Sequence, residues 1–169
     1  RPTVLNLFGY TGGASVALAE AGARVTHVDA ARNMVERCRQ NAKLSGCPDD
    51  GIRYIVDACS KFVAREKRRG NRYDGILMDP PSYGRGPNSE TWKLEDGICE
   101  LVRSAAELLS DKPLFFLINS YTTGLQPTVL ENILKLYLPS GSASAYELTL
   151  PTSDRGIKLP CGCTGIWRA

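Results

Sequence analysis

The stretch TVLNLFGYTGG at residues 3–13 decides the fold of this chain. Its first part, residues 3–8, is a short and mostly apolar run that predicts a β-strand. Small residues follow at Gly9, Gly12 and Gly13, and glycines directly after a strand let the backbone approach a ligand closely. The spacing differs from the dinucleotide pattern G-x-G-x-x-G, and no Lys-Ser or Lys-Thr pair follows, as a phosphate-binding P-loop would require. A plain glycine-rich turn is the alternative.

Strand-like and helix-like runs alternate along the rest of the chain. Expected strands lie at residues 3–8, 24–29, 52–56, 73–78, 114–119, 144–150 and 162–168, and expected helices at 15–21, 32–44, 59–69, 94–109 and 129–138. Such alternation is typical of an α/β domain with a doubly wound, mostly parallel sheet. The last two strands have no helix between them, which predicts a hairpin. We expect one domain over residues 1–169, with a loop at residues 82–89.

Composition narrows the classes of function. The 169 residues are 43% hydrophobic and 23% charged, which suits one globular domain without a membrane span. The net charge of +3 is too small to indicate a nucleic-acid partner by itself. Six cysteines fit no zinc pattern, and His27 is the one histidine, so we expect no metal site, reduced thiols and a cytoplasmic location. The chain opens with Arg1 and Pro2 instead of Met, which we interpret as a missing upstream region.

Acidic residues follow the second and third expected strands. Asp29 comes roughly 20 residues after the glycine loop, where a carboxylate can accept hydrogen bonds from both ribose hydroxyls of a nucleoside. Asp57 is followed by Ala58, and its carboxylate is placed to accept from an adenine amino group. The alternative for each aspartate is an N-cap of the next helix. A loop without a grip on pyrophosphate suits S-adenosylmethionine (SAM), whose tail is an amino acid joined to a sulfonium.

The segment DPPSY at residues 79–83 carries the expected chemistry. Its two prolines stop the preceding strand and hold the backbone in a stiff, extended path. That path fixes the Asp79 carboxylate and the Pro80 carbonyl as acceptors for an amino group that attacks the SAM methyl. Tyr83 could stack on a planar base. Asp79, Pro80 and Tyr83 are therefore the candidate catalytic residues, and an ordinary turn is the alternative.

Together these segments resemble a known family. NLFGYTGG at residues 6–13, Val28 with Asp29, and DPPSYGRG at residues 79–86 are similar to the bacterial class I SAM-dependent methyltransferases related to 23S ribosomal RNA large-subunit methyltransferases. The resemblance covers nearly the whole chain. It implies a Rossmann-like, seven-stranded sheet with an antiparallel final strand, an RNA substrate and an additional N-terminal region. The expected SAM-binding residues are Asn6, Phe8, Gly9, Tyr10, Thr11, Gly12, Gly13, Asp29, Ala30, Asp57, Ala58 and Asp79.

One departure from the family bears on the methylated atom. Members that methylate carbon 5 of cytosine carry a cysteine after the fifth strand, whereas this chain reads LINSY at residues 117–121. Ser82 also stands where another group of these enzymes has a cysteine. A nitrogen nucleophile needs no covalent help from the protein, so we expect methylation at nitrogen by direct in-line displacement, with Asp79 orienting the nucleophile.

The segment from Gly84 to Lys93 is expected to lie over the pocket and to contact substrate. Arg85 and Lys93 could meet phosphate, and Trp92 could stack on a base. The alternative is a solvent loop with Trp92 beginning a helix core. The expected substrate-binding residues are Pro81, Ser82, Arg85, Trp92, Lys93, Asn119 and Tyr121.

Two other functions remain open at this point. The first is a dinucleotide-dependent oxidoreductase on a similar sheet, which the glycine spacing and the lack of a proton donor besides Tyr83 disfavour. The second is a SAM-binding module that recognises RNA without catalytic activity. Binding of NAD without SAM would favour the oxidoreductase, and methyl transfer to RNA would exclude the inactive module.

Overall fold

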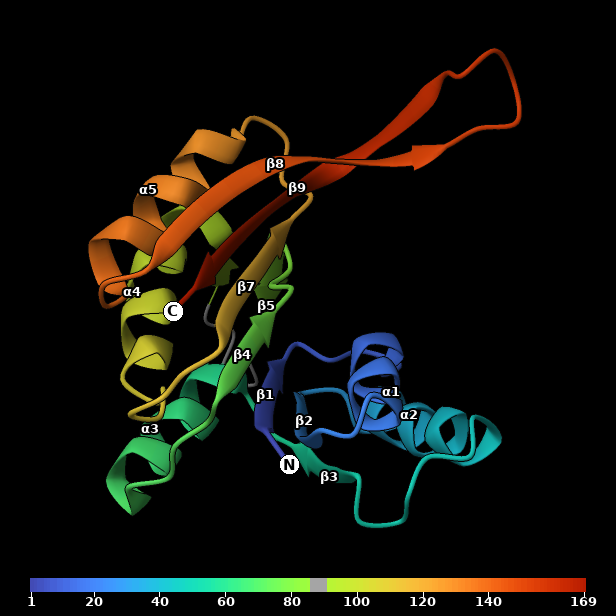
Figure 1. Ribbon diagram of the computed structural model, residues 1–169, viewed down its shortest axis with the longest axis vertical. Coiled ribbons are helices and arrows are strands. Elements are labelled where there is room, and N and C mark those ends of the chain that lie inside the picture. The colour runs from blue at the N-terminus through green and yellow to red at the C-terminus, as the bar shows by residue number, and fades with distance from the viewer. Residues whose placement is uncertain (86–90) are drawn as a thin grey trace.

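The computed structural model describes residues 1–85 and 91–169 (Figure 1). Within them, seven strands form one sheet in the order β3-β2-β1-β4-β7-β9-β8. Their bounds are β1 Thr3–Leu7, β2 Arg24–Asp29, β3 Ile52–Val56, β4 Gly75–Met78, β7 Phe115–Ser120, β8 Ser142–Pro151 and β9 Lys158–Arg168. Only β9 pairs antiparallel to both of its neighbours, whereas the strands from β3 to β7 pair in parallel. The predicted doubly wound, mostly parallel sheet with an antiparallel final strand is confirmed.

Helices cover the sheet on two sides (Figure 1). One group lies beside the strands β1 to β3, and the other packs along the opposite face. The first group is α1 Gly13–Glu20 and α2 Arg32–Leu44, and the second is α3 Cys59–Arg69, α4 Leu94–Ala106 and α5 Pro127–Tyr137. The core is accordingly in two clusters, a larger one with Phe62, Phe116 and Trp167 and a smaller one with Val16 and Val25. None of the described helices has the length and apolar character needed to cross a membrane.

Local sequence explains where several helices begin and end. Helix α3 ends at Gly70, which takes the left-handed conformation (φ 70°) that favours glycine after a helix. Its last turn carries Lys67, Arg68 and Arg69, which complement the negative end of the helix dipole. Helix α5 begins at Pro127, two residues before the predicted start, because proline is favoured in the first turn of a helix.

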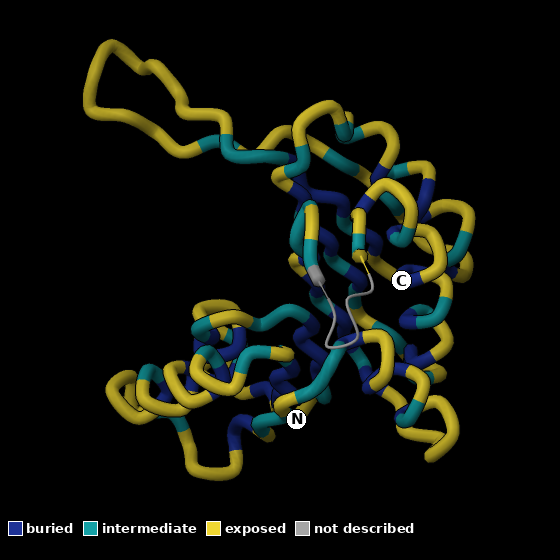
Figure 2. The backbone as a smooth tube through the Cα atoms, turned by 180° about the vertical axis from the view of Figure 1, so that it is seen from behind, coloured by how far each residue is buried: buried dark blue, intermediate teal, exposed yellow. Residues whose placement is uncertain are grey.

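Two parts of the chain contain more strand than predicted. Residues 83–85 were expected in a loop, but Tyr83–Arg85 form strand β5, which pairs antiparallel with β6 (Thr91–Lys93). Residues 86–89 of that predicted loop lie outside the described residues. The hairpin of β8 and β9 is also longer than expected, because pairing continues as far as Pro151 and Lys158. Its end projects from the body as an exposed arm (Figure 2).

Strand register brings the predicted site segments to one edge of the sheet. Leu7 of β1 pairs with Val28 of β2 on one side and with Met78 of β4 on the other. The carboxyl ends of these three parallel strands are therefore neighbours, and they carry the glycine loop, Asp29 and Asp79. This is the carboxyl edge of the sheet, where open α/β folds bind their ligands.

Candidate active site

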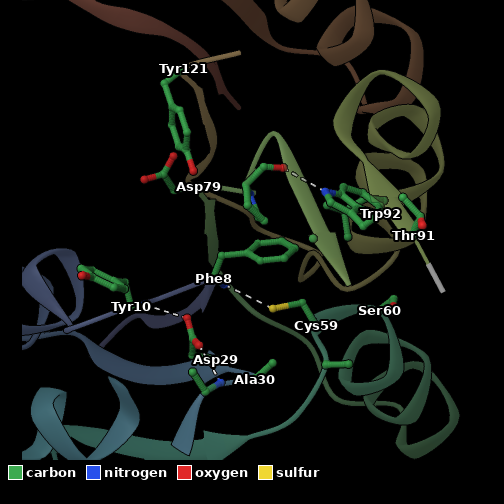
Figure 3. Close-up of a pocket in the computed structure, with 15 residues that line it drawn as sticks. Phe8, Tyr10, Asp29, Ala30, Cys59, Ser60, Asp79, Thr91, Trp92 and Tyr121 are labelled. Atoms are coloured by element: carbon green, nitrogen blue, oxygen red, sulfur yellow. Dashed lines mark hydrogen bonds between the residues drawn. The ribbon is translucent and has the colours of Figure 1, made fainter. Parts of the chain in front are cut away.

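A cavity of about 670 Å³ lies at this edge (Figure 3). Its volume falls within the roughly 300–1,000 Å³ of small-molecule sites. Nine residues predicted for the site line it: Phe8, Tyr10, Asp29, Ala30, Ala58, Asp79, Pro81, Trp92 and Tyr121. Asp29, which ends β2, and Asp79, which follows β4, therefore face one shared space. Within the described residues, they are also the only charged side chains in the cavity lining.

Backbone hydrogen bonds hold the Asp29 carboxylate in place. Its Oδ2 accepts from the Tyr10 N–H and its Oδ1 from the Ala31 N–H, each at 2.9 Å. A carboxylate offers about four lone-pair positions, so both oxygens keep capacity for further donors. The N-cap of α2 is Ala31, which has no side-chain cap. Asp29 therefore braces the turn before the helix and does not cap it.

The glycine loop contains two strained residues that line the cavity. Phe8 (φ 58°) and Tyr10 (φ 48°) both take the left-handed conformation, which residues other than glycine adopt rarely. Strain of this kind costs about 1–3 kcal/mol per residue and is concentrated at ligand sites. Gly12 (φ 88°) is in the same region, and an added Cβ there would lie 2.1 Å from Cys38 Sγ. Packing against Cys38 of α2 therefore holds the loop in one particular shape.

The corner formed by residues 79–81 is fixed by Trp92. The indole Nε1–H donates to the Pro81 carbonyl at 2.9 Å. The ring packs on Gly97 of α4, where an added Cβ would lie 2.2 Å from it, and its centroid is 6.5 Å from that of Phe8. Trp92 therefore has features of both predicted alternatives. It lines the cavity, as a substrate-binding residue would, and it also packs against the core.

Asp79 presents its carboxyl group to the cavity, and Tyr121 lies on the same side (Figure 3). Although Asp79 is exposed as a residue, protein atoms replace part of the water around its carboxyl group, and this desolvation raises its pKa. Pro80 is buried and does not line the cavity. Asp79 is therefore the acceptor of this corner that the geometry best supports.

Several predicted substrate residues lie outside the cavity. Ser82 Oγ accepts from Thr122 Oγ1 at 2.8 Å, and Asn119 Oδ1 accepts from Thr164 Oγ1 at 2.7 Å, so both side chains are engaged within the protein. Lys93 and Tyr83, the latter predicted as catalytic, are exposed on the paired strands β6 and β5 but do not line the cavity. The side chain of Arg85 lies outside what the structure describes.

The side chains of two residues predicted to bind the cofactor have partners within the protein. Asn6 has 1% of its surface exposed and donates from Nδ2 to Ser15 Oγ at 2.8 Å, so its side chain is internal. Asp57 does not line the cavity. Its Oδ1 accepts from its neighbour Ala58, and its Oδ2 forms an ion pair with Arg65 at 2.5 Å. In this structure, the carboxylate therefore pairs with a side chain of α3.

The remaining predicted loop residues support the cavity from outside. Gly9, Thr11, Gly12 and Gly13 do not line it. The Thr11 carbonyl accepts from Asn41 Nδ2 at 2.9 Å, which ties the loop to α2. These residues shape the loop, whereas Phe8 and Tyr10 provide its contacts with the cavity.

Six lining residues were missed: Ala31, Cys59, Ser60, Gly84, Thr91 and Leu101. Cys59 and Ser60 begin α3 directly after Ala58, so their place next to a predicted site residue was the available signal. Cys59 Sγ accepts from the Phe8 N–H at 3.2 Å, and burial raises the pKa of its thiol to about 12. This thiol stays protonated at neutral pH and is a poor nucleophile.

The lining fits a flat nucleoside that carries a positive charge. Asp29 offers fixed acceptors for ribose hydroxyls, and Ala30 and Ala58 leave room for a ring beside it. Two carboxylates in one partly apolar cavity favour a cation such as a sulfonium over an anionic phosphate. The acceptors and the negative charge of the cavity lining therefore match SAM better than a dinucleotide.

Comparison with solved structures supports this assignment. The SAM-dependent methyltransferase from Agrobacterium tumefaciens superposes with a TM-score of 0.92 at 35% identity, over 99% of this chain and 56% of that one. SMU.776, solved as a putative methyltransferase complexed with SAH, shares the fold with a TM-score of 0.80 at 22% identity, over 98% of this chain and 45% of that one.

Sequence relatives agree with the structural ones. Ribosomal RNA large subunit methyltransferase I of Aeromonas hydrophila is 35% identical over 81 residues, which are 47% of this chain and 20% of that protein. Methyltransferase K/L of Shewanella pealeana is 34% identical over 118 residues, or 69% of this chain and 15% of that protein. The chain thus spans a fifth or less of these curated relatives. Residues 1–134 match the family model described as S-adenosylmethionine-dependent methyltransferase, and the chain belongs to that family.

Proposed function

We propose that this chain transfers a methyl group from SAM to a base nitrogen of ribosomal RNA, with residues 1–169 acting as one catalytic domain. The observation that carries the proposal is the shared cavity of Asp29 and Asp79. Family membership supports the methyl transfer, and the similarity to ribosomal RNA methyltransferases of Aeromonas hydrophila and Shewanella pealeana supports the RNA substrate. A ribosomal RNA substrate implies a cytoplasmic location.

In this proposal, Asp29 and the strained loop hold the cofactor. SAM supplies an electrophilic methyl carbon on a sulfonium when it is bound. Asp29 accepts hydrogen bonds from the ribose hydroxyls with the lone pairs that Tyr10 and Ala31 leave free. Phe8 and Ala58 form apolar walls for the adenine ring. With Asp57 paired to Arg65, recognition of the adenine edge falls to backbone groups near Ala58.

Asp79 orients the attacking nitrogen. Its carboxylate accepts a hydrogen bond from the amino group, which turns the nitrogen lone pair toward the methyl carbon. The new C–N bond forms as the C–S bond breaks, and the nitrogen then gives up a proton. Because burial raises the pKa of Asp79, its carboxylate is a better acceptor for that proton than an ordinary aspartate. Positioning of this kind can lower the barrier by about 7–11 kcal/mol.

Methylation at nitrogen is favoured over carbon 5 of cytosine. Carbon-5 chemistry needs a thiolate that attacks the ring, and the residue after β7 is Tyr121, which lines the cavity where the family's cysteine is expected. Cys59 is the cysteine of the cavity lining, but its thiol pKa of about 12 and its hydrogen bond from Phe8 make it unsuitable. Tyr121 is instead an exposed aromatic ring that can stack on the target base.

The proposal is tested by mass spectrometry of nucleosides from ribosomal RNA incubated with SAM and the chain. We expect a base methylated at nitrogen. In Asp79→Ala, turnover should fall at least about tenfold, because an orienting acceptor is lost, while the Kd for SAM should stay within about threefold. Label on protein but not on RNA would overturn the substrate, and 5-methylcytosine would overturn the nitrogen assignment.

Two controls separate the competing functions. A thermal shift with NAD but none with SAM would point to the oxidoreductase. Asp74→Ala provides a matched loss of an aspartate outside the cavity, where Asp74 Oδ2 accepts from the backbone and hydroxyl of Thr3. It should lower stability but leave turnover per folded molecule unchanged.

A further inference from the structure

The single histidine of the chain lies directly beneath the glycine loop. His27 is on β2 and has no exposed surface, and strand register places it between Asn6 of β1 and Tyr54 of β3. An added Cβ at Gly9 would lie 2.3 Å from both Cε1 and Nδ1 of the imidazole ring. The loop therefore rests on the ring, and only glycine at position 9 permits this approach.

Two buried polar side chains connect His27 to α1 and β1. Ser15 Oγ lies 2.9 Å from His27 Nδ1, and Asn6 Nδ2 donates to the same Ser15 Oγ at 2.8 Å. Since Ser15 accepts from Asn6, its own hydroxyl proton is available to donate to Nδ1 of a neutral ring. Asn6 and Ser15 each keep 1% or less of their surface exposed. A linked set of buried polar groups favours one arrangement of the segments that carry it.

The polar character of His27 is not explained by packing. Its Nε2 has no hydrogen-bond partner among the described residues, and a buried ring nitrogen without a protein partner costs about 1–3 kcal/mol. A leucine of similar size would fill the site without that cost. A role for the imidazole in shaping the loop accounts for its presence.

The loop above His27 leads straight into the cavity. The Gly9 N–H donates to the Val28 carbonyl at 3.0 Å, and the Tyr10 N–H donates to Asp29 Oδ2 at 2.9 Å. The neighbours of His27 on β2 therefore hold the turn in which Phe8 and Tyr10 are strained. A shift of the ring would change the position of the groups that face the cofactor.

We propose that His27, Ser15 and Asn6 form a positioning network that holds the glycine loop in the shape that binds SAM. This inference rests on the proposed function. Burial lowers the pKa of His27, and the nearby Asp29 carboxylate opposes this shift. The ring is therefore neutral at neutral pH and able to accept from Ser15.

The test compares two substitutions of His27 by calorimetric titration with SAM. In His27→Asn, the Oδ1 atom takes the place of Nδ1 as the acceptor for Ser15, so the Kd should stay within about threefold of the wild type. In His27→Leu, that acceptor is lost and the Kd should rise at least about tenfold. The KM for SAM should rise in parallel, with kcat unchanged. If His27→Leu fails to fold, Ser15→Ala removes the same link at lower cost.

A control of similar destabilisation separates positioning from general loss of stability. Ile133→Ala lies on α5, in the larger core cluster, and removes a side chain that is 5% exposed. Its Kd for SAM should equal that of the wild type. A Kd for His27→Leu equal to that of the wild type would overturn the positioning role, as would an equal rise in the Ile133 variant.

Hydrogen exchange without cofactor makes the result independent of SAM. In His27→Leu, the amides of Gly9, Tyr10 and Gly12 should exchange at least about tenfold faster, while amides of α5 keep their rates. Unchanged exchange in the loop would overturn the proposal. If loop exchange responds but the wild type does not bind SAM, the proposed function fails, and the support of the loop by His27 stands on its own.

Discussion

Replacing Trp92 by phenylalanine should slow methyl transfer without weakening the binding of SAM. Trp92 donates its Nε1–H to the Pro81 carbonyl at 2.9 Å and packs on Gly97, so it ties the corner that carries Asp79 to α4. Phenylalanine keeps an aromatic ring over Gly97 but has no donor. In Trp92→Phe, the corner therefore loses the hydrogen bond that joins Pro81 to β6.

The size of the effect follows from that hydrogen bond. A neutral hydrogen bond contributes about 0.5–1.5 kcal/mol net. If about 1.0–1.4 kcal/mol of positioning is lost in the transition state, the rate falls roughly fivefold to tenfold. The contacts of Asp29 with Tyr10 and Ala31 do not involve Trp92, so the Kd for SAM should change by less than about twofold.

Single-turnover transfer of labelled methyl from SAM to RNA measures the rate, and calorimetric titration measures the Kd. Tyr146→Phe is a matched control, because it also removes one donor from an aromatic side chain, on exposed β8 and outside the cavity. A wild-type rate in Trp92→Phe would refute the reasoning. A raised KM for RNA at unchanged kcat would instead identify Trp92 as a base-stacking residue.

Three further predictions follow from the same geometry. Asp29→Ala should raise the Kd for SAM roughly thirtyfold, because hydrogen bonds to a carboxylate worth about 2 kcal/mol are lost; a smaller than threefold change in titration would contradict the ribose assignment. Gly9→Ala should lower the free energy of unfolding by about 1–3 kcal/mol in urea titrations, because the new Cβ overlaps the His27 ring, and wild-type stability would refute that contact. The pKa of His27 is lower in the folded chain than in the unfolded chain. As the pH falls below about 6.5, the imidazole of the unfolded chain is therefore protonated before that of the folded chain. The wild type should therefore lose stability from about pH 6.5 down toward the lower folded pKa, and His27→Asn should lack that component in urea titrations across this range.

The sheet could be predicted because its strands carry a strong pattern. Residues 24–29, 32–44, 52–56 and 59–69 were predicted with the observed bounds, since buried apolar runs and helix spacing define them. The projecting end of the β8–β9 hairpin gave no such pattern. Leu150, Ile157 and Leu159 are each more than half exposed, so burial does not dictate where pairing stops.

The residues of the candidate site could be predicted where they lie at the carboxyl ends of parallel strands. Asp29 and Asp79 end parallel strands, so their shared cavity follows from topology. Leu101 could not be found in this way, because it reaches the cavity only through the packing of α4. The ion pair of Asp57 could not be predicted for a similar reason, since its partner Arg65 lies two turns along α3 and the pairing depends on the helix direction.

The most direct measurement is a crystal structure of the chain with SAH bound. The account predicts that both ribose hydroxyls donate to the Asp29 carboxylate and that the sulfur lies toward Asp79 within the same cavity. SAH bound away from either aspartate, or at another edge of the sheet, would contradict it.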